Sequence, residues 1–220
     1  MHESGFWGQL GDDERKALMK EGWLREFPDS SMLCMEGEPS THLFILLSGW
    51  VKVITSDSDG REVLAAVRGE GDIAGEIAQV VGYRTATLRA LGKVRALVIG
   101  AEKFGNFLDV HMQTARIYRR IMAEYQHAAH DSQRGMTILS GPRRLARLLL
   151  ALAERHGTRS AEGIVTTLPL SQEDLASLIG SSRSTVTRAL RQWRVRRIIA
   201  TRQRHIVIVD PAALRRVAGE

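Results

Sequence analysis

The sequence predicts an α+β protein with an N-terminal β jelly-roll barrel, a long central helix and a C-terminal winged helix-turn-helix. Between residues 30 and 103, short apolar runs alternate with clusters of Gly, Asp, Ser and Pro, a pattern typical of short antiparallel strands. Residues 104–139 show a helical pattern without proline. After Gly141-Pro142, two short helical patterns precede a hairpin pattern. We therefore expect a barrel over residues 1–105, a central helix over 106–139 and a winged helix-turn-helix over 140–220.

A short helical lead-in is expected over residues 1–24. Asp12 or Asp13 is the predicted cap of a helix that runs through Leu18, and Gly22 follows it. The barrel strands come next, and residues 57–60, Asp-Ser-Asp-Gly, predict a hairpin turn between two of them. Many short strands at regular spacing indicate a barrel or jelly roll. The clearest apolar runs are 43–47, 51–54, 63–67 and 96–99.

The central helix carries a recurring apolar or small-residue stripe that resembles an interrupted coiled-coil seam. One explanation is a helix packed on its own barrel. The other is a helix-to-helix homodimer, which we favour because a helix of this length outruns a small barrel. Gly141-Pro142 then breaks the chain, and proline is well tolerated at the first position of the next helix. The stripe consists of Val110, Ala115, Tyr118, Met122, Tyr125 and Ala129.

The region from Leu170 to Asp210 carries the most informative pattern. Ser171, followed by Asp174 three residues later, approximates a capping box for a short helix. Gly180 allows a sharp turn, and Ser182 is placed to cap a second helix. The second helix has an apolar face and a polar one. The apolar face consists of Val186, Leu190 and Trp193; the polar face consists of Arg183, Ser184, Thr187, Arg188 and Arg191.

Charge is concentrated in this last third of the chain. From residue 141 onward there are 15 Arg, no Lys and 6 acidic residues, a net charge of +9; residues 1–140 hold 16 basic and 19 acidic residues, a net charge of −3. A basic domain on an acidic partner domain suggests a nucleic-acid ligand. A solvated arginine face is the alternative, but the two short helices, the glycine turn and the following hairpin favour binding of double-stranded DNA.

On this interpretation the second helix enters the major groove. Arg183 and Arg188 can each donate two hydrogen bonds to a guanine, while Ser184 and Thr187 can meet a base edge or a phosphate. Residues 198–200 and 206–209 predict a two-stranded wing, and Arg202 and Arg204 near its tip suit phosphate contact. The complete predicted DNA-binding set is Ser171, Ser182, Arg183, Ser184, Thr187, Arg188, Arg191, Arg202 and Arg204.

Several functional classes are excluded or disfavoured. The chain shows no P-loop, no supported pair of catalytic carboxylates and no Ser or Cys nucleophile motif, so we do not expect an enzyme. No apolar run reaches about 18 residues and the start lacks a signal-peptide pattern, so a cytoplasmic location without membrane association is expected. The single cysteine, Cys34, is expected to be a buried or half-buried thiol in a strand. His127 and His130 are interpreted as surface or interface residues, and no metal or haem site is expected.

With these residues in hand, the chain resembles the Crp/Fnr family of bacterial regulators along nearly its whole length. Residues 181–188, Ser-Ser-Arg-Ser-Thr-Val-Thr-Arg, look like the family's recognition helix. A set of glycine-centred motifs looks like its cyclic-nucleotide-binding barrel. These motifs are Gly37-Glu38, residues 43–49, Val51-Lys52-Val53, Asp59-Gly60, Gly71-Asp72 and Gly75-Glu76.

The resemblance implies a ligand site in the barrel. Gly75 and Glu76 match the positions where a backbone amide and a carboxylate hold a ribose hydroxyl. Arg84, Thr85 and Ala86 match the cassette that binds a cyclic phosphate, and a short helix beginning near Glu76 would add backbone amides. Two central-helix positions that contact the purine in the family match Ala129 and His130 here.

This chain departs from the family pattern in three places. The stretch between Glu76 and Arg84 looks shorter, Ala129 and His130 differ from the family's usual Thr and small polar residue, and Ser184 replaces an acidic residue in the recognition helix. The resemblance implies a homodimer that binds a palindromic operator, needs no resident cofactor, contacts RNA polymerase and responds to a cyclic nucleotide such as cAMP. The alternative is a regulator of the same fold with a vestigial barrel or a different effector, which binds DNA without cyclic nucleotide.

Overall fold

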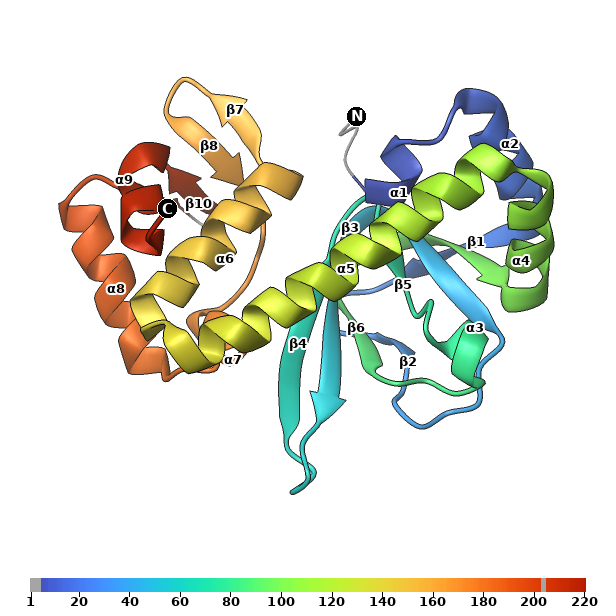
Figure 1. The fold of residues 1–220 in the computed structure, drawn as a ribbon, viewed down its shortest axis with the longest axis horizontal. Coiled ribbons are helices and arrows are strands. Elements are labelled where there is room, and N and C mark those ends of the chain that lie inside the picture. Colours follow the sequence, from blue (N-terminus) through green and yellow to red (C-terminus); the bar gives the residue numbers. More distant parts are fainter. Residues whose placement is uncertain (1–4, 203–204) are drawn as a thin grey trace. The chain divides into compact units, whose positions relative to one another are not determined.

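A computed structural model describes residues 5–202 and 205–220 (Figure 1). The chain divides into two compact units, and the division falls between Tyr125 and Gln126, inside helix α5 (Met112–Ile138). From the sequence we placed the boundary later, at Gly141-Pro142. The second half of α5 therefore belongs to the C-terminal unit.

The first unit is built on an antiparallel β-sheet in the order β1-β6-β3-β4, with β2 paired to β6 and β5 to β3 (Figure 1). The expected runs 43–47 and 51–54 are a single long strand whose pairing shifts around Ser48. Gly49, at φ +87°, makes this shift possible, because an added Cβ would collide with the carbonyl of Lys93. The strands are β1 (Gly22–Phe27), β2 (Met32–Cys34), β3 (His42–Ser56), β4 (Glu62–Arg68), β5 (Ile73–Ala74) and β6 (Thr87–Gly100).

Both faces of the central strands are buried, which explains why β3 reads as a continuous apolar run. Leu43 and Ile45 pack in a cluster that includes helical residues such as Phe104. Phe44 and Leu46 point the other way, into a second cluster inside the barrel. Alternate side chains of a strand lie on opposite faces, so the sheet separates the helical layer from the barrel interior. The hairpin turn predicted at residues 57–60 is confirmed between β3 and β4, with Gly60 at φ +76°.

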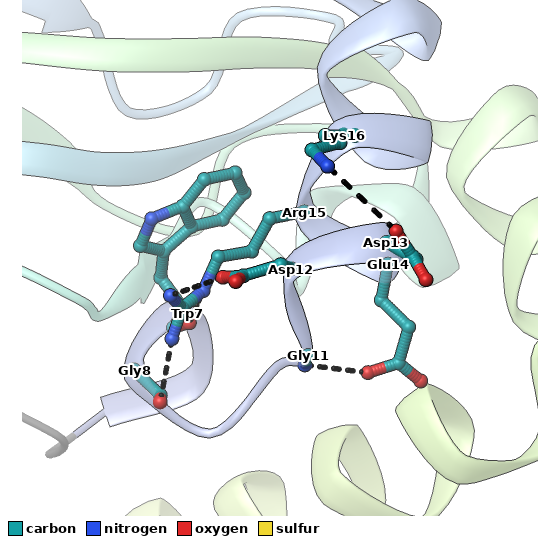
Figure 2. Close-up of polar contacts among 8 residues, drawn as sticks. All are labelled: Trp7, Gly8, Gly11, Asp12, Asp13, Glu14, Arg15 and Lys16. Atoms are coloured by element: carbon teal, nitrogen blue, oxygen red, sulfur yellow. Dashed lines mark hydrogen bonds and ion pairs between the residues drawn. The ribbon is translucent and has the colours of Figure 1, made fainter.

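The N-terminal lead-in forms α1 (Gly5–Gly8) and α2 (Asp12–Glu21). The predicted caps Asp12 and Asp13 are wrong, because Gly11 is the N-cap residue and its N–H donates to Glu14 Oε2 at 2.8 Å. Figure 2 shows the Arg15 guanidinium reaching back to α1, where it donates to the carbonyls of Trp7 (3.0 Å) and Gly8 (2.8 Å). One cation thus satisfies the carbonyl end of α1 and ties it to α2.

The central helical segment is not continuous. His111, at φ −104° and ψ 77°, separates α4 (Ala101–Val110) from α5, which corrects the single helix expected over residues 106–139. Three members of the predicted dimer stripe, Tyr118, Met122 and Tyr125, pack in the cluster that joins the helices to the barrel of their own chain, so the alternative explanation holds for them. Ala115 is also buried within the single chain. The other two members, Val110 and Ala129, are exposed.

The second unit is a winged helix-turn-helix, as predicted (Figure 1). Its antiparallel sheet has the order β7-β8-β10-β9. Among the described residues, no helix is both long and apolar enough to cross a bilayer. The helices are α6 (Gly141–His156), α7 (Gln172–Leu178), α8 (Arg183–Val195) and α9 (Pro211–Ala218); the strands are β7 (Thr158–Ser160), β8 (Gly163–Thr166), β9 (Ile199–Arg202) and β10 (His205–Ile208).

Candidate functional site

Local capping fixes the two helices of the helix-turn-helix. The predicted capping box is confirmed: Ser171 Oγ accepts from the N–H of Asp174, and the Asp174 carboxylate accepts from the N–H of Ser171, both at 3.0 Å. Ser182 caps α8 by accepting from the N–H of Thr185 at 3.2 Å. Gly180 has φ +55°, a conformation that glycine adopts with little strain. The sequence thus specifies where each helix starts and how sharply the chain turns between them.

Helix α8 presents the predicted polar face to solvent. Val186, Leu190 and Trp193 are at most 3% exposed, while the five residues of the polar face, Arg183, Ser184, Thr187, Arg188 and Arg191, are all exposed. One residue that we did not predict joins this face. Gln172, at the start of α7, accepts a hydrogen bond from the Thr187 hydroxyl at 2.5 Å, which leaves its amide N–H groups available as donors.

Of the two wing arginines predicted to contact DNA, the structure describes Arg202. Arg202 lies at the end of β9, and its guanidinium pairs with Glu162 at 2.7 Å. Arg204 lies outside the described residues. Arg194, near the end of α8, donates to the Thr201 hydroxyl at 3.2 Å and so links the recognition helix to the wing.

Arg144 joins the end of α5 to the turn of the helix-turn-helix. Its guanidinium donates to the carbonyls of Leu139 (2.5 Å), Ile179 (2.6 Å) and Gly180 (3.0 Å). Carbonyls at a helix end lack partners within the helix, and here one planar cation serves two such ends. A Cβ on Gly141 would come within 2.9 Å of Ser181 Oγ, so the chain after α5 packs closely on the same turn. These contacts explain why the end of α5 belongs to the C-terminal unit.

In the barrel unit, five of the seven predicted ligand residues meet at one pocket. Gly75 and Glu76 follow β5, and Arg84, Thr85 and Ala86 precede β6. The same pocket has apolar walls and a second guanidinium, that of Arg68, which we did not predict. The lining is Val53, Arg68, Ala74, Gly75, Glu76, Ile77, Ala78, Arg84, Thr85, Ala86 and Leu88.

Arg84 is the central feature of this pocket. The residue is only 2% exposed, and its Nη1 donates to the carbonyl of Gly75 at 3.1 Å. Its Nη2 is buried and has no hydrogen-bond partner among the described residues. Burial lowers the pKa of this guanidinium, although nearby acidic groups oppose the effect. A buried cation with an unused donor has the chemistry required to bind an anion.

Two neighbours shape the surroundings of Arg84. Gly75 has φ +75°, and an added Cβ would collide with Arg84 Nη1, so only glycine permits this close approach. Burial raises the pKa of the Glu76 carboxyl above its ordinary value, and the charges of Arg68 and Arg84 offset only part of this rise. The short helix α3 (Ala78–Val81) begins two residues after Glu76. This is the short helix that the resemblance implied near Glu76, and it consists of a single turn.

The lining of this pocket does not include Ala129 or His130, which are exposed residues of α5 in the second compact unit. Cys34 is a buried residue of β2, as predicted, and its thiol lies 3.9 Å from the carbonyl of Ala86. Among the described residues, no group of three or more His, Cys, Asp or Glu side chains is arranged to hold a metal ion.

Comparisons with known proteins agree with both halves of this site. Residues 24–111 match the model of the cyclic nucleotide-binding domain, and residues 143–217 match that of the Crp-like helix-turn-helix domain. The CRP-like cAMP-activated global transcriptional regulator of Mycobacterium tuberculosis is 30% identical over 203 residues, which cover 92% of this chain and 91% of that protein.

Solved structures show the same fold. FixK2 from Bradyrhizobium japonicum superposes with a TM-score of 0.78 at 22% identity, over 89% of this chain and 96% of that one. A CRP-family transcriptional regulator from Thermus thermophilus gives a TM-score of 0.72 at 25% identity, over 89% and 97% of the two chains. The chain belongs to the Crp/Fnr family of transcription regulators, which are DNA-binding proteins and not enzymes.

Proposed function

We propose that this regulator is a homodimer whose affinity for a palindromic operator is modulated by a cyclic nucleotide, with cAMP as the first candidate. One observation supports a cyclic-nucleotide effector above all. The buried guanidinium of Arg84 has an unpartnered donor and lies in the pocket that Gly75 and Glu76 also line. The name of the Mycobacterium tuberculosis relative describes that protein as cAMP-activated. RNA polymerase is the expected further partner, since a transcription regulator acts through that enzyme.

The pocket fits a cyclic nucleotide by the chemistry of its donors. Arg84 would neutralise the cyclic phosphate, and Thr85 would add a hydroxyl donor. The small side chain of Ala86 leaves room for the phosphate, and Glu76 would accept from a ribose hydroxyl. The apolar walls suit the sugar and the edge of a base. We expect the base to be read less stringently than in the family pattern, because Ala129 offers no hydroxyl; one lost neutral hydrogen bond costs about 0.5–1.5 kcal/mol.

The dimer proposal rests on the free surface of α5 and on the geometry of operators. From Gln126 to Ile138 every residue except Gly135 is exposed in the single chain, including the apolar Met136 and Ile138. Each chain has one recognition helix, and two helices related by a twofold axis read half-sites about one helical turn apart. Light scattering at micromolar concentration should give the dimer mass with and without nucleotide, and a monomer in both conditions would contradict the proposal.

The effector is tested by calorimetric titration of the wild type and the Arg84→Ala variant with cAMP and cGMP, followed by operator binding. Arg89→Ala is the matched control, because Arg89 lies on β6 of the same barrel and pairs with Glu62 in a two-pronged contact at 2.7 and 3.0 Å. We expect wild type and Arg89→Ala to bind nucleotide and Arg84→Ala to lose binding. An absence of heat and of thermal shift for the wild type at millimolar nucleotide would favour the vestigial-barrel alternative.

A further inference from the structure

Arg68 connects the barrel pocket to α5. It is the last residue of β4 and one of the pocket-lining side chains. Its guanidinium carbon lies 3.8 Å from the centroid of the Tyr125 ring, which is a close cation–π contact. Arg84 is instead directed to the carbonyl of Gly75 and lies 5.1 Å from the centre of the Phe44 ring. The two guanidiniums of the pocket therefore rest on different parts of the unit, and Arg68 rests on the helix.

Tyr125 is itself held by a buried carboxylate. Its hydroxyl donates to Asp72 Oδ1 at 3.1 Å, and Asp72 Oδ2 accepts from the N–H of Gly69 at 2.9 Å. Asp72 is 1% exposed and Tyr125 is 9% exposed. The aromatic ring is thus fixed at its hydroxyl by the turn between β4 and β5, and covered on its face by Arg68. Both contacts come from the segment that leads from β4 into the pocket.

We propose that Arg68 is a positioning residue that reports occupancy of the pocket to α5. An anionic ligand in the pocket and the face of the Tyr125 ring attract the same guanidinium. When the ligand draws Arg68 toward itself, the ring loses its cation, and the hold of the barrel on this turn of α5 changes. This inference rests on the proposed function, because it needs an anionic effector in the pocket.

The place of Tyr125 in the chain gives this contact its consequence. Tyr125 is the last residue of the barrel unit, and α5 continues without a break to Ile138, three residues before α6 begins at Gly141. A change in how tightly the barrel holds this turn therefore acts on a helix that leads into the DNA-binding unit. Allosteric coupling requires one element that both ligands bias, and α5 at Tyr125 meets that description.

The test separates nucleotide affinity from coupling. Arg68→Met keeps most of the length of the side chain and removes its charge, and Tyr125→Leu removes the aromatic ring. The double variant combines both changes, and Arg89→Met is the control. Each is titrated with cAMP by calorimetry, and its operator affinity is measured at zero and at saturating cAMP. The coupling is the ratio of the two operator affinities.

We expect Arg68→Met and Tyr125→Leu each to bring the coupling ratio close to one, and the double variant to lose no more than either single one, because both remove the same contact. The nucleotide affinity should change by less than about fivefold, since Arg84 still binds the phosphate. Arg68→Lys, which keeps a charge near the ring, should restore part of the coupling. A normal ratio in Arg68→Met, with the wild type responding to cAMP, would overturn this inference and leave the proposed function standing.

A second measurement decides the case in which the wild type shows no response to nucleotide. Hydrogen exchange of the ligand-free protein is then compared over residues 118–130. Faster exchange in both single variants, with no further increase in the double variant, would support the hold of Arg68 on α5 through Tyr125 while the proposed function fails. Unchanged exchange in these variants would overturn the inference as well.

Discussion

Replacing Arg144 with alanine should loosen the DNA-binding unit at the point where α5 meets the helix-turn-helix. The change removes three charge-assisted hydrogen bonds, to Leu139, Ile179 and Gly180, and leaves three carbonyls without their donor. A hydrogen bond to a charged group contributes about 1.5–3 kcal/mol. The three share one half-buried guanidinium, and water can reach the exposed Gly180, so we expect a total loss of about 2–3 kcal/mol in the free energy of unfolding.

That loss is large enough to measure by calorimetry. For a unit the size of residues 126–220, each kcal/mol shifts Tm by about 4–8 °C, so the melting transition of this unit should fall by about 8–24 °C. Operator binding should weaken in parallel, because a looser turn leaves α8 in its binding position for a smaller fraction of the time. A tenfold smaller fraction raises the apparent Kd about tenfold.

Arg147→Ala is the matched control, since Arg147 is on the same helix but is exposed and makes one hydrogen bond, to the carbonyl of Ala218 at 3.3 Å, and a 3.8 Å ion pair with Glu220. Its Tm should change little. Arg144→Lys should recover only part of the loss, because an ammonium lacks the planar fork that serves three carbonyls at once. Equal Tm values for Arg144→Ala and Arg147→Ala would refute the reasoning.

Four further substitutions test the ligand pocket and the DNA-binding surface. Gly75→Ala should abolish nucleotide binding by calorimetry and lower stability by about 1–2 kcal/mol, because the residue has φ +75° and its new Cβ would displace Arg84. Burial raises the pKa of Glu76, so its proton stabilises the fold at low pH and this stability is lost as pH rises through the folded pKa. Glu76→Gln should therefore raise Tm relative to wild type at about pH 8 and leave it unchanged near pH 4. Arg183→Ala should cost about 1–3 kcal/mol and relax preference at one base pair in operator binding, whereas Arg202→Ala should lower the slope of log affinity against log salt by about one unit.

Local patterns in the sequence were sufficient for much of the fold. The capping box at Ser171, the glycine turn at Gly180 and the apolar spacing of α8 each depend on residues within a few positions of one another, and each is confirmed. The run of β3 was divided wrongly, because a glycine inside a strand reads as a turn when it marks a shift in pairing. The meeting of Gly75 and Glu76 with Arg84 came from the family resemblance and not from spacing.

The errors concern contacts between distant parts of the chain. Tyr118 and Met122 have the spacing of a dimer seam, but the same spacing also serves a helix that packs on its own barrel. Arg68 was missed because an arginine at the end of a strand has no distinctive pattern; its role depends on Tyr125, 57 positions later along the chain (125 − 68). Arg144 was missed for the same reason, since its partners lie on another helix end. Sequence periodicity identifies which face of a helix is apolar but not which surface covers it.

The acidic partners of the predicted DNA-binding arginines bear on how this surface binds phosphate. Arg183 lies 3.9 Å from Glu173 and Arg202 lies 2.7 Å from Glu162, and all four side chains are more than half exposed. Exposed pairs of this kind contribute at most about 1 kcal/mol, so a guanine can replace Glu173 on Arg183, and a phosphate can replace Glu162 on Arg202, at low cost. Glu162→Gln should therefore strengthen operator binding only slightly. The slope of log affinity against log salt concentration should not change, because it depends on the number of phosphates that basic side chains contact, and that number stays the same.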